Sequence, residues 1–313
     1  MNRFVRQVLP FASLIILILF LTIKEYDKFL TWSNFMNVFR RSSVNGIIAV
    51  GMTMIIISGG IDLSVGSILA VSGMAGALVI IKMGMGLDAM IVGSIVGMAV
   101  GMLCGILNGT LITKAKLAPF IVTLGTMSVC RGISYVMNDG QPYNVPDYRW
   151  LGEGLVLGIP ISILIFVAVV AAAMFVLKYT RLGRYTYAIG SNKDAAFHAG
   201  INVDRNLIWI YALTGFLSGI AAMIQTSRTV SAQPTAGIAL ELDTIAAVVI
   251  GGASLSGGRG TILGTVIGTL LISFLRNGCT LLGISTNVQL IVIGVIIVVA
   301  VSVDQFAQSK AKV

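Results

Sequence analysis

Apolar residues occur in long runs along this chain, and short segments between the runs contain most of its charges. The first run, at 9–23, ends at a charged cluster. A helix needs about 20 apolar residues to cross a lipid bilayer. Because no small-residue cleavage pattern precedes the charged cluster, we expect a retained and slightly short first span rather than a signal peptide.

Further apolar runs follow the first one along most of the chain: 44–58, 67–81, 89–113, 118–137, 157–177, 207–227, 242–253, 261–276 and 287–303. No polar stretch is long enough to form a separate domain. The sequence therefore predicts an all-α polytopic membrane protein with about ten transmembrane helices and a single domain over residues 1–313.

Residues 24–43 have a different pattern, in which large apolar side chains recur at helical spacing between polar ones: Phe29, Trp32, Phe35, Met36 and Phe39. This pattern is typical of an amphipathic helix lying in the membrane interface. We expect such an interfacial helix over 24–43, with its aromatic rings at the level of the lipid headgroups.

Two polar breaks, at 139–156 and 178–206, set the predicted orientation. The second is rich in Lys and Arg, which are enriched in cytoplasmic loops. We therefore place 178–206 in the cytoplasm and 139–156 outside. Both chain termini are then expected to be cytoplasmic.

The amino-acid composition excludes several classes of protein. Of the 313 residues, 57% are hydrophobic and 11% are charged, whereas soluble proteins have about 25% charged residues. This excludes a soluble enzyme, a disulfide scaffold and a disordered chain. The formal net charge of +9 comes from basic residues in the gaps between the runs, so we expect no nucleic-acid partner. The 3 cysteines and 1 histidine lack metal-ligand spacing, and we expect no cofactor or metal.

Glycines recur every four residues at two places: Gly93, Gly97, Gly101, Gly105 and Gly109, and then Gly260, Gly264 and Gly268. Small residues at this spacing form a groove along one helix face, where a neighbouring backbone can approach closely. These stripes predict tight helix packing and do not locate a substrate.

Two glycine-containing segments resemble each other. Residues 59–66 (GGIDLSVG) and 251–258 (GGASLSGG) share five of eight positions, and each follows an apolar run. Paired Gly-interrupted segments in two halves of a membrane protein indicate a transport pathway. The sequence thus predicts two related halves. A count of ten spans places both segments on the same side of the membrane, but one miscounted span would invert the relation, which stays open.

Charged residues within or beside apolar runs are candidates for function. Asp62 is an intramembrane acid, although capping of the following helix explains it as well. Glu241 and Asp243 precede an apolar run, where acids suit a helix N-terminus. Arg131, inside the run at 118–137, requires an acid, a carbonyl group or a water-filled cavity as its partner.

The chain lacks its own ATP chemistry. Gly252 and Gly257 have the spacing of a P-loop, but Gly258 and Arg259 occupy the positions that require Lys and Ser or Thr. We therefore expect no enzyme activity, and energy for any uphill transport must come from elsewhere.

Several motifs together resemble those of a known family. Residues 194–196 (DAA), followed by Gly200, resemble the Glu-Ala-Ala…Gly coupling loop of ABC importer permeases, with Asp194 in place of the usual Glu. Residues 60–66 (GIDLSVG), 180–185 (TRLGRY), 231–237 (SAQPTAG) and 251–258 are similar to motifs of ribose/xylose/galactose-type sugar permeases. The resemblance covers about residues 35–305.

The resemblance implies a bacterial inner-membrane permease of a monosaccharide such as ribose, which works by ATP-driven alternating access. It implies three protein partners besides membrane lipid: a cytoplasmic ABC ATPase subunit, a periplasmic or lipid-anchored sugar-binding protein, and a second permease copy in a homodimer or a heterodimer. The residues implied to contact the ATPase are Asp194, Ala195, Ala196 and Gly200. Those implied to line or gate the pathway are Gly60, Asp62, Ser64, Gly66, Gln233, Pro234, Gly251, Gly252 and Ser256.

Two other classes of protein stay open. An ion-gradient-driven transporter of a small polar solute would use Asp62, Arg131 or Glu241 as a relay. A membrane scaffold that only anchors a partner would tolerate bulky residues at Gly60 or Gly252.

Overall fold

The structure, a computed structural model, describes the backbone of residues 3–309 and the side chains of 11–296, 298, 299 and 302. Its longer helices are α1 (Arg3–Lys24), α3 (Trp32–Ile57), α4 (Val65–Lys82), α5 (Leu87–Lys114), α6 (Pro119–Val136), α8 (Ile161–Tyr179), α11 (Val203–Thr229), α12 (Leu240–Ile250), α13 (Ile262–Leu281) and α14 (Thr286–Ser309).

Short elements connect these helices. They are the helices α2 (Tyr26–Phe29), α7 (Trp150–Glu153), α9 (Arg181–Ser191) and α10 (Lys193–His198), and four two-residue strands. Strand β1 (Tyr143–Asn144) pairs antiparallel with β4 (Ser231–Ala232), with Tyr143 opposite Ala232. Strand β2 (Leu155–Val156) pairs with β3 (Ile159–Pro160) in a hairpin.

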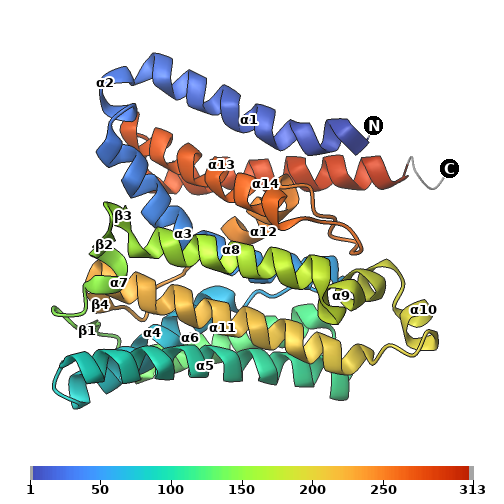
Figure 1. Cartoon of the computed structure of the whole chain (residues 1–313), viewed down its shortest axis with the longest axis horizontal. Helices are drawn as coiled ribbons and strands as arrows, with labels where there is room; N and C mark the ends of the chain where they lie inside the picture. The colour runs from blue at the N-terminus through green and yellow to red at the C-terminus, as the bar shows by residue number, and fades with distance from the viewer. Residues whose placement is uncertain (1–2, 310–313) are drawn as a thin grey trace.

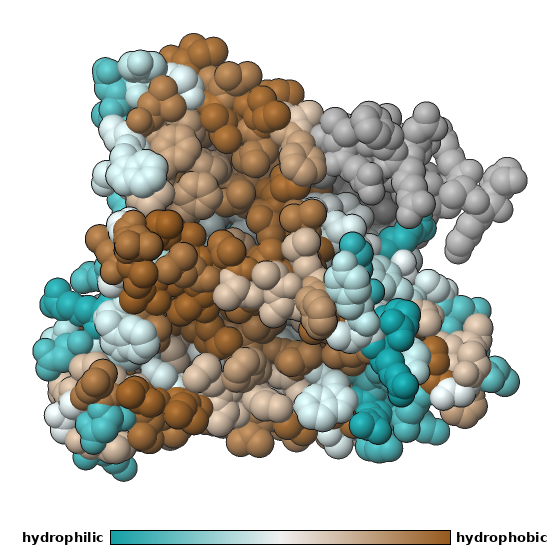
Figure 2. Space-filling model, in the orientation of Figure 1, coloured by the Kyte–Doolittle hydropathy of each residue, from teal (hydrophilic) through white to brown (hydrophobic). Residues whose placement is uncertain are grey.

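The short elements lie at two opposite ends of the molecule (Figure 1). Helices α9 and α10 lie at one end, with the start of α1 and the end of α14, and we call this the α10 end. The strands and α7 lie at the other end, which we call the β end. Apolar residues dominate the middle of the face in Figure 2, while hydrophilic residues gather towards the two ends. This distribution is that of a protein surrounded by lipid at its middle.

Each of the ten predicted apolar runs coincides with a helix, and this agrees with an all-α membrane protein. Among the described residues, 5 helices are long and apolar enough to cross a membrane: α4, α5, α8, α11 and α13. Helix α12 has only 11 residues, which at 1.5 Å per residue span about 16 Å. The structure therefore does not confirm a count of ten spans.

Residues 24–43 do not form one separate helix, contrary to the sequence-based expectation. The helix breaks at Glu25 and again at Thr31, whose hydroxyl accepts the Asn34 backbone N–H at 3.2 Å, and α3 then continues to Ile57. The physical reason is an internal aromatic cluster. The rings of Phe29, Phe35 and Phe39 pack around Phe274 of α13, with centroid distances of 6.0, 5.7 and 6.2 Å. The position of this segment relative to the membrane surface stays a prediction.

The glycine stripe of α5 packs the interior as the sequence predicts. Methyl groups at Gly93 and Gly97 would meet backbone atoms of α4, and methyl groups at Gly101, Gly105 and Gly109 would meet the backbone of α11. The absence of side chains thus lets α5 lie directly against both helices. The stripe after α12 has the same role, because Gly264 contacts the Gly251 carbonyl and Gly268 contacts the Ala247 carbonyl.

Candidate translocation and coupling site

The two related glycine segments form neighbouring turns. The first follows α3 and the second follows α12, and the Gly258 N–H donates to the Ile57 carbonyl at 2.8 Å. Each helix ends in the same way, with a glycine of positive φ: Gly59 (+82°) after α3 and Gly252 (+90°) after α12. In each case the next N–H bonds back to the helix, from Gly60 to Ile55 and from Ala253 to Val248. These are the bonds of a Schellman C-cap, which requires a left-handed residue. Since the turns touch, both segments lie on the same side of the molecule.

Helix α9 contacts both turns. Gly190 lies directly against the Ile57 carbonyl and the Gly258 nitrogen, so that a methyl group would overlap both. In addition, the Tyr187 hydroxyl donates to the Gly260 carbonyl at 2.8 Å. Movement of α9 must therefore disturb the contact between the two turns.

Helix α10 is joined to α9 by a single residue, Asn192, whose side-chain oxygen accepts the Ala195 N–H at 2.9 Å. Of the predicted coupling residues, Asp194 and Ala195 are exposed and Ala196 is buried. Gly200 has φ +81° and closes the helix, while the Ile201 N–H bonds to the Ala196 carbonyl at 3.1 Å. Phe197 projects from this helix with 68% of its side chain exposed. Helix α10 is therefore a small exposed projection that is fixed to α9.

Asp62 lies at the centre of a buried polar chain. Its Oδ1 accepts the Ser64 N–H at 2.8 Å and the Ser64 hydroxyl at 2.5 Å. Asn108 of α5 donates to the Ser64 hydroxyl at 2.9 Å, and Thr126 of α6 donates to Asn108 at 2.6 Å. Asp62 is fully buried, and its Oδ2 has no hydrogen-bond partner in the described part of the chain. The carboxylate thus orders the turn before α4 and links it to α5 and α6.

Arg131 has backbone carbonyls as partners, which is one of the three options open from the sequence. Its Nη1 donates to the carbonyls of Pro234 and Ala236 at 2.5 and 2.8 Å. This fixes the segment after β4, where Gly237 packs closely on Gly66 at the start of α4. Arg131 is therefore a positioning residue for the 231–237 motif in this structure.

The other predicted residues are spread more widely. Gln233 lines a cavity of about 30 Å³ between α4 and α11. Gly251 is a packing contact with α13, and Ser256 is exposed in the second turn. The acid of Asp243 forms an ion pair with Arg276 at 2.8 Å. The structure thus brings the 59–60 turn and the 251–258 segment together at the α10 end. Gln233 and Pro234 belong to another segment, which Gly237 joins to the start of α4 through Gly66.

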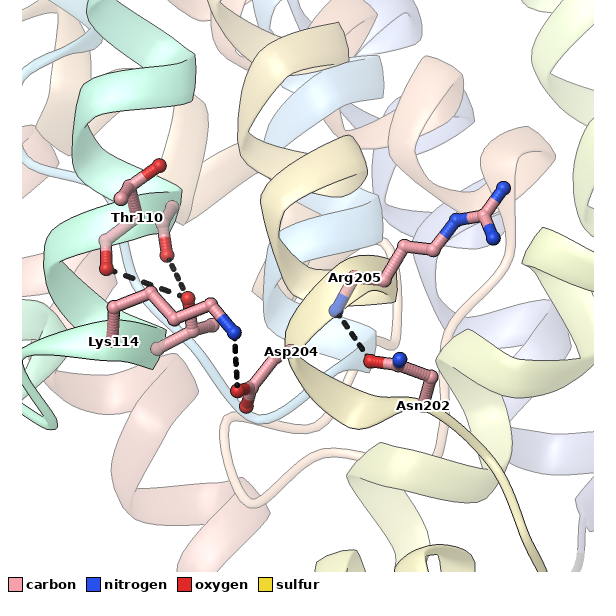
Figure 3. A network of polar contacts seen from close by, with 7 residues as sticks. Thr110, Lys114, Asn202, Asp204 and Arg205 are labelled. Carbon is pink, nitrogen blue, oxygen red and sulfur yellow. Dashed lines mark hydrogen bonds and ion pairs between the residues drawn. The ribbon is translucent and has the colours of Figure 1, made fainter.

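A cleft of about 630 Å³ opens beside the first turn, and its lining includes Gly60, Tyr211 and Lys193. Tyr211 donates its hydroxyl to the Ile61 carbonyl at 3.1 Å. At the rim, Lys114 at the end of α5 pairs with Asp204 at the start of α11 at 3.4 Å (Figure 3). The cleft thus has a mixed lining, in which apolar side chains such as Ile112 and Leu207 lie beside the charged groups of Lys193 and Asp204.

Sequence reasoning missed three residues of this site: Gly190, Asn108 and Phe197. Asn108 carries a usable signal, because it is an amide inside the apolar run at 89–113. Phe197 is apolar within a polar cytoplasmic segment, which also marks it. Gly190 has no local signal, since its role depends on contacts with two distant turns.

Comparisons with known proteins find one matching family and several similar permeases. The profile of the family described as branched-chain amino acid transport system, permease component, matches residues 34–301. The chain is similar to the ribose import permease protein RbsC of Bacillus subtilis, with 50% identity over 95% of this chain and 92% of the relative. It is 44% identical to the RbsC protein of Haemophilus influenzae, over 99% of this chain and 96% of the relative. It is 42% identical to the RbsC protein of Escherichia coli K12, over 90% of this chain and 88% of the relative. No solved structure matches this chain.

Proposed function

The chain belongs to the family of branched-chain amino acid transport system permease components, and we propose from this membership that it is the membrane subunit of an ATP-driven importer of a monosaccharide. The similarity to ribose import permeases supports ribose or a related sugar as the cargo. The family resemblance predicted from the motifs is thereby confirmed.

The contacts of α9 carry the mechanistic proposal. Helix α10 docks on a cytoplasmic ATPase subunit, with Asp194 and Phe197 facing the partner and Ala196 and Gly200 fixing the shape of the helix. ATP-driven closure of the ATPase pair moves α10, and α9 transmits this movement to the turns at Ile57 and Gly258. The switch requires that the ATP-bound ATPase interacts better with one state of the permease than with the other.

The same proposal sets the topology. The α10 end is cytoplasmic, and the β end, which includes 139–156, receives the sugar from a periplasmic or lipid-anchored binding protein. We propose ten spans, cytoplasmic chain termini and a location in the bacterial inner membrane. Two permease copies, identical or related, form the pathway between them.

Co-purification with the ATPase tests the role of α10. We expect Phe197→Ala and Gly200→Arg to reduce recovery of the ATPase at least tenfold while the permease pair persists. The Gly200 variant acts by placing a side chain at positive φ. Trp32→Ala is the matched control, because it removes an aromatic ring that is 73% exposed and lies on α3, away from α10. Normal ATPase recovery with both α10 variants would exclude α10 as the coupling helix.

A second function is favoured by one observation, the buried Asp62 with an unpartnered carboxyl oxygen. In an ion-gradient-driven transporter, this group would carry a proton or bind a cation. Transport in membranes without any ATPase, abolished by Asp62→Asn, would support that alternative and contradict ATP-driven import.

A further inference from the structure

A second large cleft lies among α3, α7, α11 and α13. Its volume is about 640 Å³, and four arginines line it: Arg40, Arg41, Arg228 and Arg276. The lining also contains the amides of Asn34, Asn37, Asn45 and Asn277. The contributing parts of α3, α11 and α13 are those that lie towards the β end, next to α7 (Figure 1). The cleft is therefore separate from the one beside the glycine turns.

The positive charge in this cleft is largely uncompensated. Glu153 is the acidic residue of its lining and pairs at 3.9 Å with Arg149, while Arg276 pairs with Asp243. Within the part of the chain that the structure describes, Arg40, Arg41 and Arg228 form no ion pair.

Two further observations show that these arginines have donor capacity and charge to spare. Arg228 has the neutral side chain of Gln225 as a partner at 2.7 Å, and it lies within electrostatic range of Arg41, whose like charge repels it. The Nε atoms of Arg40 and Arg276 are buried and have no hydrogen-bond partner among the described residues. Arg40, Arg228 and Arg276 are half-buried and Arg41 is exposed. Like charges that are partly removed from water repel one another more strongly than in bulk solvent, so an anion between them would stabilise this arrangement.

The chemistry of the donors selects the anion. Guanidinium groups present several N–H donors in a planar fork, which suits phosphate oxygens. None of the cleft residues that the structure describes is aromatic, and the charges are unbalanced, so the lining does not match a neutral sugar.

We propose that this cleft binds a phosphate group through Arg40, Arg41 and Arg228, and that the phosphate belongs to the headgroup of an anionic membrane phospholipid. The parts of α3, α11 and α13 that line the cleft lie towards the β end (Figure 1). Hydrophilic residues gather towards the ends of the molecule (Figure 2), where headgroups lie in a bilayer. The site is distinct from the proposed sugar pathway, and its test does not depend on transport.

Binding to the purified, delipidated protein tests the proposal. We compare phosphatidylglycerol, phosphatidylcholine and inorganic phosphate by native mass spectrometry and by thermal stability. We expect phosphatidylglycerol to bind at least tenfold more tightly than phosphatidylcholine. The double variant Arg41→Gln, Arg228→Gln should lose this preference. Arg205→Gln, which removes an exposed arginine at the start of α11, towards the α10 end and away from this cleft, should keep it.

The outcomes separate the possible sources of the phosphate. Stabilisation by inorganic phosphate that depends on Arg41 and Arg228, without preference for phosphatidylglycerol, would support the phosphate site and replace the lipid with a soluble phosphate ester. Equal binding of both lipids by the wild-type protein, together with no effect of phosphate, would overturn the proposal. The wild-type comparison holds even if the double variant fails to fold.

Discussion

Substitution of Gly190 by Ala tests the contact between α9 and the two glycine turns. The new methyl group would overlap the Ile57 carbonyl and the Gly258 nitrogen, which are backbone atoms and cannot move aside by a rotamer change. Such overpacking costs about 1–3 kcal/mol. If the Gly258–Ile57 hydrogen bond breaks as well, about 1 kcal/mol more is lost.

If the substitution destabilises the contact between the turns by about 2 kcal/mol, the equilibrium between closed and separated turns shifts roughly 30-fold towards the separated state. Hydrogen exchange reports this directly, because the Gly258 amide donates the hydrogen bond between the turns. We expect exchange at this amide to be roughly 30-fold faster in Gly190→Ala. Sugar uptake should fall, and ATP hydrolysis should become less dependent on the binding protein.

Gly125→Ala provides the matched control for this experiment. Gly125 is also inside a helix, α6, but a methyl group there would meet nothing within 4 Å. Both substitutions gain the same helix propensity, so their difference isolates the steric clash. Equal exchange at Gly258 in the two variants would refute the contact of α9 with the turns.

Three other variants test separate parts of the structure. Asn108→Leu removes the acceptor of the buried Thr126 hydroxyl and one donor to the Ser64 hydroxyl, so we expect a loss of about 2 kcal/mol in thermal denaturation. An unchanged Tm would argue against the polar chain. Arg131→Ala removes the Nη1 donor that two carbonyls share and should cost about 1.5–3 kcal/mol in thermal denaturation. Full stability of this variant would remove the positioning role of Arg131. Burial raises the pKa of Tyr148 to about 12, although its hydrogen bond with Ser94 opposes this. Since the pKa of Tyr148 is higher in the folded state, its contribution to the free energy of unfolding should be complete below pH 10 and fall as the pH rises towards 12. Tyr148→Phe should remove this contribution in denaturation measured over that pH range. The same pH profile for the variant and the wild type would contradict the buried Tyr148 hydroxyl as its source.

Some features of the fold could be predicted from the sequence and others could not. Apolar runs located the helices, because hydrophobic length is sufficient to mark a helix in lipid. The pattern over 24–43 did not reveal the breaks at Glu25 and Thr31, since apolar side chains at helical spacing look the same whether or not some of them pack on Phe274. The sequence also located both glycine turns, since each ends an apolar run.

The candidate site was less predictable than the fold. The partner of Arg131 required tertiary information, since carbonyls, acids and water all satisfy a guanidinium. The contact of Gly190 joins three segments that are far apart in the sequence, and no local pattern contains it. Motif resemblance identified α10, but only the structure connects α10 to the turns through α9.

Sugar uptake by a reconstituted system is the measurement that tests the central claim most directly. Proteoliposomes would contain this chain with its ATPase, and radiolabelled ribose would be supplied with the binding protein. The account predicts uptake that requires ATP, the ATPase and the binding protein together, and that Gly200→Arg abolishes. Uptake that continues without the ATPase under an ion gradient, and that is lost in Asp62→Asn, would contradict it.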